Sequence, residues 1–278
     1  MGTLFVVSTP IGNLSDLTRR AEEALGEAAV VLAEDTRRTG VLLRHLGVET
    51  PLISLHQHNE AGRTREVLGR LASGAVLALV ADAGTPLVSD PGGRLVEAVI
   101  AEGHTVVPIP GPSAVLAALV GSGLPADRFA FLGFSPRKGR DREAFLARVA
   151  DSEETTILFE SPERISALLD DLAKRCGRTR RVAVARELTK LHEEFVRGTL
   201  IEASRYYREN PPRGEITVVV EAAPESAEGE LSDEEAVRVL ARSALDRGLR
   251  PSAAAREVAR RLGAPRNQVY RIVQSLDS

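Results

Sequence analysis

The chain has 278 residues, of which 43% are hydrophobic and 27% charged, and its net charge is −3 at pH 7. This composition is typical of a globular protein long enough for two modest domains, and the charge does not indicate nucleic-acid binding by the chain as a whole. No apolar run has transmembrane length, no signal peptide is recognisable, and the single cysteine excludes an internal disulfide. We therefore expect a cytoplasmic protein without membrane contact.

Strand-like apolar runs alternate with helix-like segments over residues 1–124, which we predict to form an N-terminal α/β domain. Its predicted strands are 3–8, 29–34, 51–55, 75–81 and 104–110, and its predicted helices are 17–28, 36–47, 59–74, 94–103 and 113–123. Short apolar strands separated by helices favour a mainly parallel sheet that is covered on both faces.

A second series over residues 125–222 predicts a C-terminal α/β domain. Its predicted strands are 127–134, 155–161, 180–187, 193–200 and 215–222, and its predicted helices are 141–150, 164–176 and 202–210. The predicted fold class is therefore α/β, with two sheets in two domains.

A small-residue, acidic linker, residues 223–231, precedes a predicted helical tail, residues 232–278, with a helix-turn-helix pattern. We expect Ser232 to cap the first helix, and Ser252 and residues 264–266 to begin the other two. The tail holds nine arginines against six acidic residues. This excess indicates either contact with phosphates or simply the preference for arginine over lysine seen throughout the chain.

One long loop, residues 82–93 with the sequence DAGTPLVSDPGG, separates a predicted strand from a predicted helix, although about two to six residues suffice for such a connection. It carries Asp82 and Asp90 and no basic residue, and the chain lacks the glycine motifs that bind nucleotide phosphates. We therefore expect a ligand with hydroxyl groups or positive charge. Asp90 is explained more simply as a helix cap, which leaves Asp82, Gly84 and Thr85 to be explained by ligand binding.

Other chemistry has weaker support. His56 and His58 lie two residues apart without a third His or Cys nearby, so we expect no metal site. Cys176 ends a predicted helix among basic residues, which lowers a thiol pKa, but we expect no catalytic role for it.

Eight motifs occur together in an order that resembles one protein family. They cover residues 9–21, 33–39, 82–92, 110–114, 122–138, 158–165, 186–194 and 214–221. Their sequences resemble the bacterial ribosomal RNA small subunit methyltransferase I family, a branch of the tetrapyrrole methylase superfamily. The resemblance implies a two-domain class III methyltransferase with a cleft between its α/β domains, a C-terminal helix-turn-helix segment and a homodimer.

In function, the resemblance implies S-adenosylmethionine-dependent methylation of the ribose 2′-oxygen of a cytidine in the decoding centre of 16S rRNA, in the small ribosomal subunit. S-Adenosylmethionine carries an ammonium group, a sulfonium and a ribose diol but no phosphate, which agrees with an acidic loop 82–93. Two departures stand out. Glu163 replaces the His more usual in relatives, and the first loop lacks the G-x-G-x-G-D of corrin-acting relatives, which argues against a tetrapyrrole substrate.

The resemblance also implies which residues contact the cofactor. In this sequence these positions are Pro10, Asp82, Gly84, Thr85, Ser113, Ala114, Leu158 and Phe159. No metal is implied.

Methyl transfer to a hydroxyl requires alignment of the two partners and a base that removes the hydroxyl proton. Our candidates are Glu187 and Lys190, with Glu160 third. Lys190 needs a lowered pKa to serve as the base; otherwise it orients the hydroxyl or binds phosphate. The alternative for this stretch is a structural ion pair between Arg186 and Glu187.

Phosphate contact is expected at Arg137, Lys138 and Arg140, in a glycine-containing basic stretch, although basic residues of this kind often only face solvent. Two other functions stay open: methylation of a small molecule such as a tetrapyrrole, and a ligand-sensing, DNA-binding regulator that uses the tail.

Overall fold

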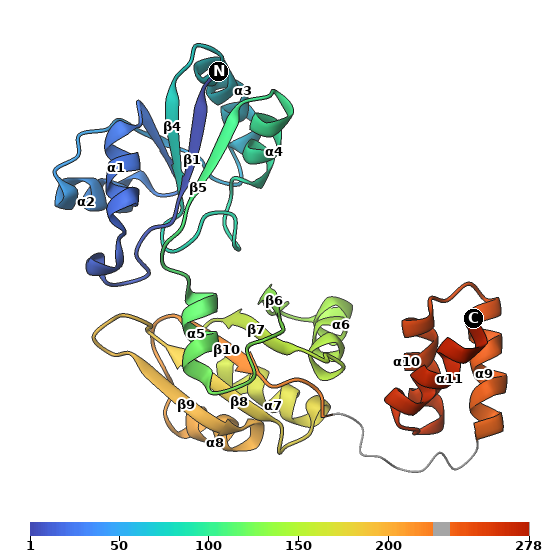
Figure 1. Cartoon of the computed structure of the whole chain (residues 1–278). Coiled ribbons are helices and arrows are strands. Elements are labelled where there is room, and N and C mark those ends of the chain that lie inside the picture. Colours follow the sequence, from blue (N-terminus) through green and yellow to red (C-terminus); the bar gives the residue numbers. More distant parts are fainter. Residues whose placement is uncertain (225–233, 278) are drawn as a thin grey trace. The chain divides into compact units, whose positions relative to one another are not determined.

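The computed structural model describes residues 1–224 and 234–277 (Figure 1). They form two compact units: residues 1–150 together with 154–221, and residues 151–153 together with 222–278. The expected cap Ser232 and residues 225–231 of the expected linker lie outside the described residues.

The first sheet has the order β3-β2-β4-β1-β5, and all its strand pairs are parallel, which confirms the prediction. Its strands are β1 (Thr3–Val7), β2 (Val30–Ala33), β3 (Leu52–Ser54), β4 (Val76–Val80) and β5 (Thr105–Ile109). The helices around it are α1 (Arg19–Glu27), α2 (Thr36–Leu46), α3 (Glu60–Ala72) and α4 (Gly93–Ala101), with a short 3-10 helix η1 (Leu14–Asp16). Separate apolar clusters pack α1 and α2 on one face and α3 and α4 on the other (Figure 1).

The second sheet has the order β6-β7-β10-β8-β9, in which only β6 and β7 are parallel. Its strands are β6 (Phe129–Phe134), β7 (Thr155–Glu160), β8 (Arg181–Arg186), β9 (Glu194–Thr199) and β10 (Ile216–Val220). The helices α6 (Gly139–Ala150), α7 (Ile165–Cys176) and α8 (Leu200–Glu209) form one apolar core with it. We call the two sheets with their helices the first lobe and the second lobe.

Helix α5 (Ala114–Ser122) covers the opposite face of the second sheet. Its Val115, Ala118 and Leu119 are buried against strands β7, β8 and β10. The sequence assignment of residues 1–124 groups this helix with the first lobe, but its apolar side chains pack on the second sheet.

Helix α4 differs from expectation at its start. Its N-cap is Gly92, with a φ of 116°, and no side chain of the loop caps it. The carboxylate of Glu60, from α3, instead accepts a hydrogen bond from the Leu95 amide at 3.2 Å. The prediction that Asp90 caps this helix is therefore wrong, because a neighbouring helix supplies the acceptor.

The second unit contains α9 (Glu234–Asp246), α10 (Pro251–Leu262) and α11 (Arg266–Asp277), packed around a shared alanine- and valine-rich core. Helix α10 begins at Pro251, one residue before the expected Ser252, and α11 begins at Arg266, within the expected range.

Candidate functional site

A cavity of about 400 Å³ lies within the first unit, between loops of the two lobes. The first lobe contributes the loop after β4 and the turn between β5 and α5, and the second contributes the end of β7, Leu188 and the start of β10. The lining residues are Ile11, Arg38, Asp82–Thr85, Val88–Asp90, Ser113–Val115, Phe134, Phe159–Pro162, Leu188 and Gly214–Thr217. This volume is in the range of small-molecule sites.

The start of the loop after β4 is held tightly against the first strand. Gly84 has a φ of 78° and forms a two-way backbone bridge with Thr9, at 2.9 and 3.0 Å. The Thr85 hydroxyl accepts from the Ser8 hydroxyl at 3.1 Å and donates to the Pro112 carbonyl at 3.2 Å. Three neighbouring segments at the carboxyl edge of the first sheet are thereby locked together.

The later part of this loop is strained. Leu87 and Ser89 have φ values of 72° and 69°, in the left-handed region that residues other than glycine rarely occupy. Ser89 also approaches the second lobe, because a Cβ atom on Gly133 of β6 would lie 3.5 Å from its hydroxyl oxygen. The strained loop therefore reaches across the cavity.

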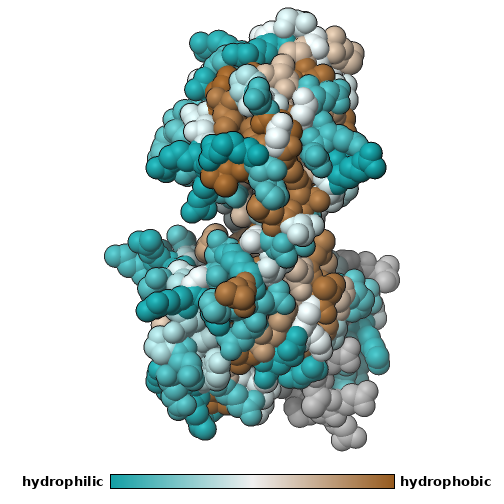
Figure 2. Space-filling view, turned by 90° about the vertical axis from the view of Figure 1, so that its left-hand side faces the viewer, coloured by the Kyte–Doolittle hydropathy of each residue, from teal (hydrophilic) through white to brown (hydrophobic). Residues whose placement is uncertain are grey.

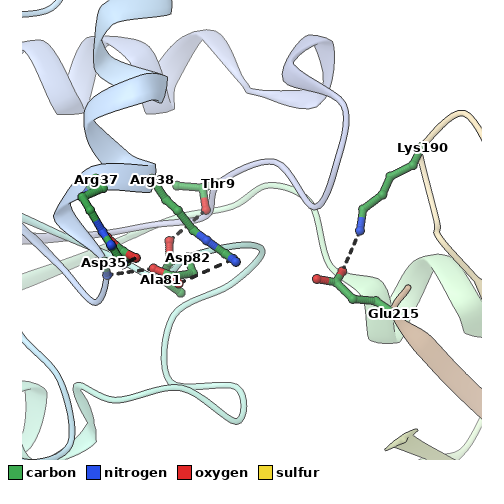
Figure 3. Close-up of polar contacts among 8 residues, drawn as sticks. All are labelled: Thr9, Asp35, Arg37, Arg38, Ala81, Asp82, Lys190 and Glu215. Carbon is green, nitrogen blue, oxygen red and sulfur yellow. Dashed lines mark hydrogen bonds and ion pairs between the residues drawn. The ribbon is translucent and has the colours of Figure 1, made fainter. Parts of the chain in front are cut away.

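Asp82 stands at the centre of a polar network on the first lobe (Figure 3). Its carboxylate accepts a hydrogen bond from the Asp35 amide at 2.8 Å and lies 3.6 Å from Arg38. Asp35 caps α2 and pairs with Arg37 at 2.7 Å, and hydrogen bonding to that guanidinium holds the pKa of Asp35 well below its usual range.

Two further carboxylates of the first lobe lie close to Asp82. Burial, followed by the charges of Glu34 and Asp82, raises the pKa of Asp90 to about 6. Burial, followed by the charge of Asp82, also raises the pKa of Glu34. These groups repel one another, so this wall of the cavity favours a ligand with positive charge.

The second lobe pairs its carboxylates. The Glu160 side chain is buried, forms an ion pair with Arg164, accepts from the Ser135 hydroxyl and accepts from the Ser161 amide at 2.8 Å. Lys190 lies between Glu187 and Glu215, at 2.9 and 3.1 Å, and Figure 3 shows the contact with Glu215.

These pairings bear on the expected base. Burial opposes the charge of Lys190, but hydrogen bonds to Glu187 and Glu215 prevail and raise its pKa, the opposite of what a lysine base requires. Burial likewise favours protonation of Glu187, but the Glu215 amide and Lys190 prevail and lower its pKa. The alternative pair of Arg186 with Glu187 is not formed, since Arg186 pairs with Glu194 at 3.1 Å.

The structure brings together most, but not all, of the residues expected from the sequence. Seven of them line the cavity: Asp82, Gly84, Thr85, Ser113, Ala114, Phe159 and Glu160. Pro10, Leu158, Glu187 and Lys190 are not in its lining. The Leu158 side chain is fully buried in the core of the second lobe, on the face of the sheet opposite Phe159.

Sequence reasoning missed the cavity roles of Asp90, Leu188 and residues 214–217. Strand β10 runs antiparallel to β7, so the beginning of β10 lies at the edge where β7 ends. A search confined to the carboxyl ends of strands overlooks such a segment. The motif at 214–221 was the one signal that pointed to it.

Arg137, Lys138 and Arg140 are exposed, just before and within the first turn of α6. Arg142 of the same stretch is instead used within the fold, since it pairs with Asp171 at 2.8 Å. The three exposed side chains lie outside the cavity lining.

Within the described ranges, no group of three or more His, Cys, Asp or Glu side chains is arranged to hold a metal ion. The rings of His56 and His58 lie 6.0 Å apart, centroid to centroid. No helix in residues 1–224 or 234–277 has the length and apolarity needed to span a membrane.

The chain is similar to known proteins in both sequence and fold. Residues 3–204 match the family model described as Tetrapyrrole (Corrin/Porphyrin) Methylases, and residues 230–277 match the RsmI C-terminal HTH domain. A ribosomal RNA small subunit methyltransferase I from Synechocystis is 47% identical over 100% of this chain and 99% of its own length. Another relative of that name, from Xylella fastidiosa, is 45% identical over 97% of this chain and 98% of its own.

Among solved structures, uroporphyrin-III C-methyltransferase from Thermus thermophilus, complexed with S-adenyl homocysteine, is similar in fold. The TM-score is 0.55 at 22% identity, over 78% of this chain and 97% of that one.

Proposed function

Since the chain belongs to the tetrapyrrole methylase family, and within it to the ribosomal RNA small subunit methyltransferase I group, we propose that it methylates the ribose 2′-oxygen of a cytidine in the decoding centre of 16S rRNA. Methylation of ribosomal RNA from S-adenosylmethionine rests on full-length relatives of that name. The ribose oxygen and the cytidine are our proposal. An RNA substrate of this kind would place the enzyme in the cytoplasm.

The observation that carries the proposal is the character of the cavity. Arg38 is the one basic side chain among the lining residues, and its guanidinium is close to Asp82, whereas Asp82 and Asp90 contribute negative charge. Apolar walls are supplied by Ile11, Val88 and Phe159. An ammonium, a sulfonium, a ribose and an adenine ring fit these surroundings, whereas a polyphosphate does not.

When bound, S-adenosylmethionine would supply an electrophilic methyl carbon on a positively charged sulfur. We propose that Asp82, Gly84 and Thr85 hold it from the first lobe, with Ser113 and Ala114 at the turn into α5 and Phe159 across the cavity. Pro10 and Leu158 would contribute through packing behind the lining, since neither residue belongs to it.

For Glu160, Glu187 and Lys190 we propose a positioning role. Each is held in an ion pair on the second lobe, and together they fix the wall against which the ribose would lie. Orientation of the hydroxyl toward the methyl carbon is the main contribution that a protein makes to such a displacement.

We propose that Arg137, Lys138 and Arg140 contact the phosphates of the RNA backbone. Their exposure leaves the three charges available for phosphates, and such contacts position an RNA without reading its sequence.

We propose a homodimer, with helix α5 in its interface. Leu116 and Val120 are 52% and 77% exposed and lie four residues apart, on the side of the helix away from the second sheet. Figure 2 shows apolar surface at the junction of the two lobes, the level at which α5 lies in Figure 1. Apolar surface of this kind favours association.

The decisive experiment incubates the protein with labelled S-adenosylmethionine and small ribosomal subunits from cells that lack the endogenous enzyme. We expect label in 16S rRNA, as a 2′-O-methyl cytidine in the decoding centre. Label on a base, or at another nucleotide, would reject the proposed position. Cofactor binding without any label on RNA would favour a small-molecule substrate, and RNA or DNA binding without methyl transfer would favour a regulator.

A further inference from the structure

Asp90 differs from every other carboxylate in the cavity lining. Asp82 accepts a backbone hydrogen bond and lies beside Arg38, Glu160 is paired with Arg164, and Glu215 is paired with Lys190. Within residues 1–224 and 234–277, Asp90 has no hydrogen-bond or ion-pair partner. It is therefore the carboxylate of the lining whose two oxygens are both free to accept a substrate proton.

The backbone around Asp90 is strained, so contacts with the rest of the protein must hold it in this conformation. Leu87 and Ser89 both occupy left-handed conformations immediately before it, and Gly92 follows with a φ of 116°. Each such residue other than glycine costs about 1 kcal/mol or more, so surrounding contacts must enforce the conformation. Helix capping does not explain it, because Glu60 serves the amide of Leu95 in α4.

The loop carries Asp90 to the side of the cavity that faces the second lobe. Its neighbour Ser89 lies against Gly133 of β6, and Phe134, next in that strand, also lines the cavity. A substrate that enters between the lobes therefore meets Asp90 from one side and the paired wall of Glu160 and Glu215 from the other.

The charges around Asp90 tune its basicity. Burial is the main cause that raises its pKa to about 6, and Glu34 and Asp82 act in the same direction. On the first lobe Arg38 lies beside Asp82, and on the second lobe Arg164 pairs with Glu160 while Lys190 pairs with both Glu187 and Glu215. A carboxylate of this kind is ionised at neutral pH yet more basic than an ordinary aspartate, which suits general-base catalysis.

We propose that Asp90 is the general base of the methyl transfer and accepts the proton of the ribose 2′-hydroxyl. This rests on the proposed function of the cavity. As the oxygen–carbon bond to the methyl group forms, the carbon–sulfur bond breaks and its electron pair returns to sulfur. The O–H bond breaks as well, and its proton passes to Asp90. The oxygen gains positive character as it is methylated, so a base with near-neutral pKa suffices to remove the proton.

The test compares Asp90→Asn with Asp127→Asn, an exposed aspartate before β6 that serves as the matched control. Each variant is measured for binding of S-adenosylhomocysteine by calorimetry and for single-turnover methylation of small subunits. We expect Asp90→Asn to bind S-adenosylhomocysteine within about threefold of the parent but to methylate about 100- to 10,000-fold more slowly. Asp127→Asn should match the parent in both measurements.

The pH dependence is the second measurement. In the parent, the single-turnover rate should fall as the pH is lowered through about 6, because protonated Asp90 no longer accepts a proton. The residual rate of Asp90→Asn should lose this step, and Asp90→Glu should restore part of the rate together with a pH step.

Several outcomes would overturn the role of Asp90. Turnover of Asp90→Asn near that of the parent would do so, and loss of S-adenosylhomocysteine binding would make Asp90 a cofactor ligand instead. Glu187→Gln is measured alongside: if it alone abolishes turnover, Glu187 is the base. Failure of the parent to methylate small subunits would reject the proposed function, which is a different result from failure of one variant.

Discussion

The two walls of the cavity hold their carboxylates in opposite ways. On the first lobe, Glu34, Asp82 and Asp90 lie near one another, and among the described residues only Asp82 of these three has an ion-pair partner, Arg38 at 3.6 Å. On the second lobe, Glu160 is paired with Arg164, and Glu187 and Glu215 share Lys190. The fold therefore leaves carboxylates without an ion-pair partner on the first wall, whereas each of these carboxylates on the second wall has one.

The difference separates two kinds of buried charge. A paired carboxylate stabilises the wall in which it lies, and the wall loses stability if one partner is removed. Carboxylates that repel one another reduce stability, and a cationic ligand that enters between them relieves the repulsion. The first wall is thus the better candidate for ligand binding and chemistry, and the second for support.

The largest expected effect comes from breaking an ion pair on the second wall. Replacing Arg164 with Leu leaves the buried Glu160 without its cation, and we expect a loss of about 3 to 5 kcal/mol in the free energy of unfolding. Chemical denaturation at neutral pH measures it. Arg175→Leu is the control, because its exposed pair with Glu143 should contribute less than about 1 kcal/mol. Equal losses in both variants would contradict the distinction between the walls.

On the first wall, removing a charge should increase the free energy of unfolding rather than reduce it. The pKa of Asp90 is raised from 3.8 to about 6, so the folded state disfavours its ionised form. This penalty is absent below about pH 3.8, develops as the pH rises from about 3.8 to about 6, and is complete above about 6. At pH 7 to 8, Asp90→Asn should therefore stabilise the protein by up to about 3 kcal/mol.

The same variant measured near pH 4 serves as its own control, since Asp90 is protonated there in the folded parent. Denaturation curves at the two pH values give the comparison. A gain that is equal at both, or a loss at pH 7, would show that Asp90 is not destabilised by its surroundings.

A smaller effect is expected where the first wall depends on backbone conformation. Gly84→Ala places a Cβ at a φ of 78° and 3.2 Å from Ile11 Cγ2, which costs about 1 to 2 kcal/mol. We expect about tenfold weaker binding of S-adenosylhomocysteine. Gly139 has a nearly equal φ of 79° but nothing within 4 Å of a Cβ, so Gly139→Ala carries the strain without the cavity contact. Similar binding by both variants would contradict a special role for Gly84.

The smallest change in stability is expected outside both walls. Replacing Arg137, Lys138 and Arg140 together with Gln should leave the free energy of unfolding within about 0.5 kcal/mol. RNA affinity should become less dependent on salt, with the logarithmic slope reduced by about 2 if all three contact phosphates. Titrations of a decoding-centre RNA at several salt concentrations measure the slope, and an unchanged slope would place the RNA elsewhere.

Much of this architecture is present in the sequence as a pattern. The alternation of apolar strands and helices predicts the parallel first sheet, because a helix after each strand lets the next strand run in the same direction. The motif around Gly84 and Thr85 locates one wall of the cavity, since it combines glycine with polar residues directly after a buried strand.

The rest depends on contacts between distant residues. Asp90 has the local pattern of a helix cap, and only the position of Glu60 in another helix makes that role unnecessary. The pairing of Lys190 with Glu215 depends on where β10 begins relative to β8, a register that local sequence does not encode. Likewise, α5 is apolar on all sides, so its sequence does not indicate which sheet it covers.

Among the described residues, the chain passes from the first sheet to the second once, through residues 110–113 between β5 and α5. Pro110 and Pro112 have restricted backbone torsions. Position 111 requires glycine, because a Cβ there would lie 2.9 Å from Ser8 Cβ, and Ser113 lines the cavity. Any opening of one lobe against the other must be taken up by torsions in this stiff segment. The segment that joins the two sheets therefore also forms part of the cavity lining, so a change in its torsions would change the shape of the ligand site.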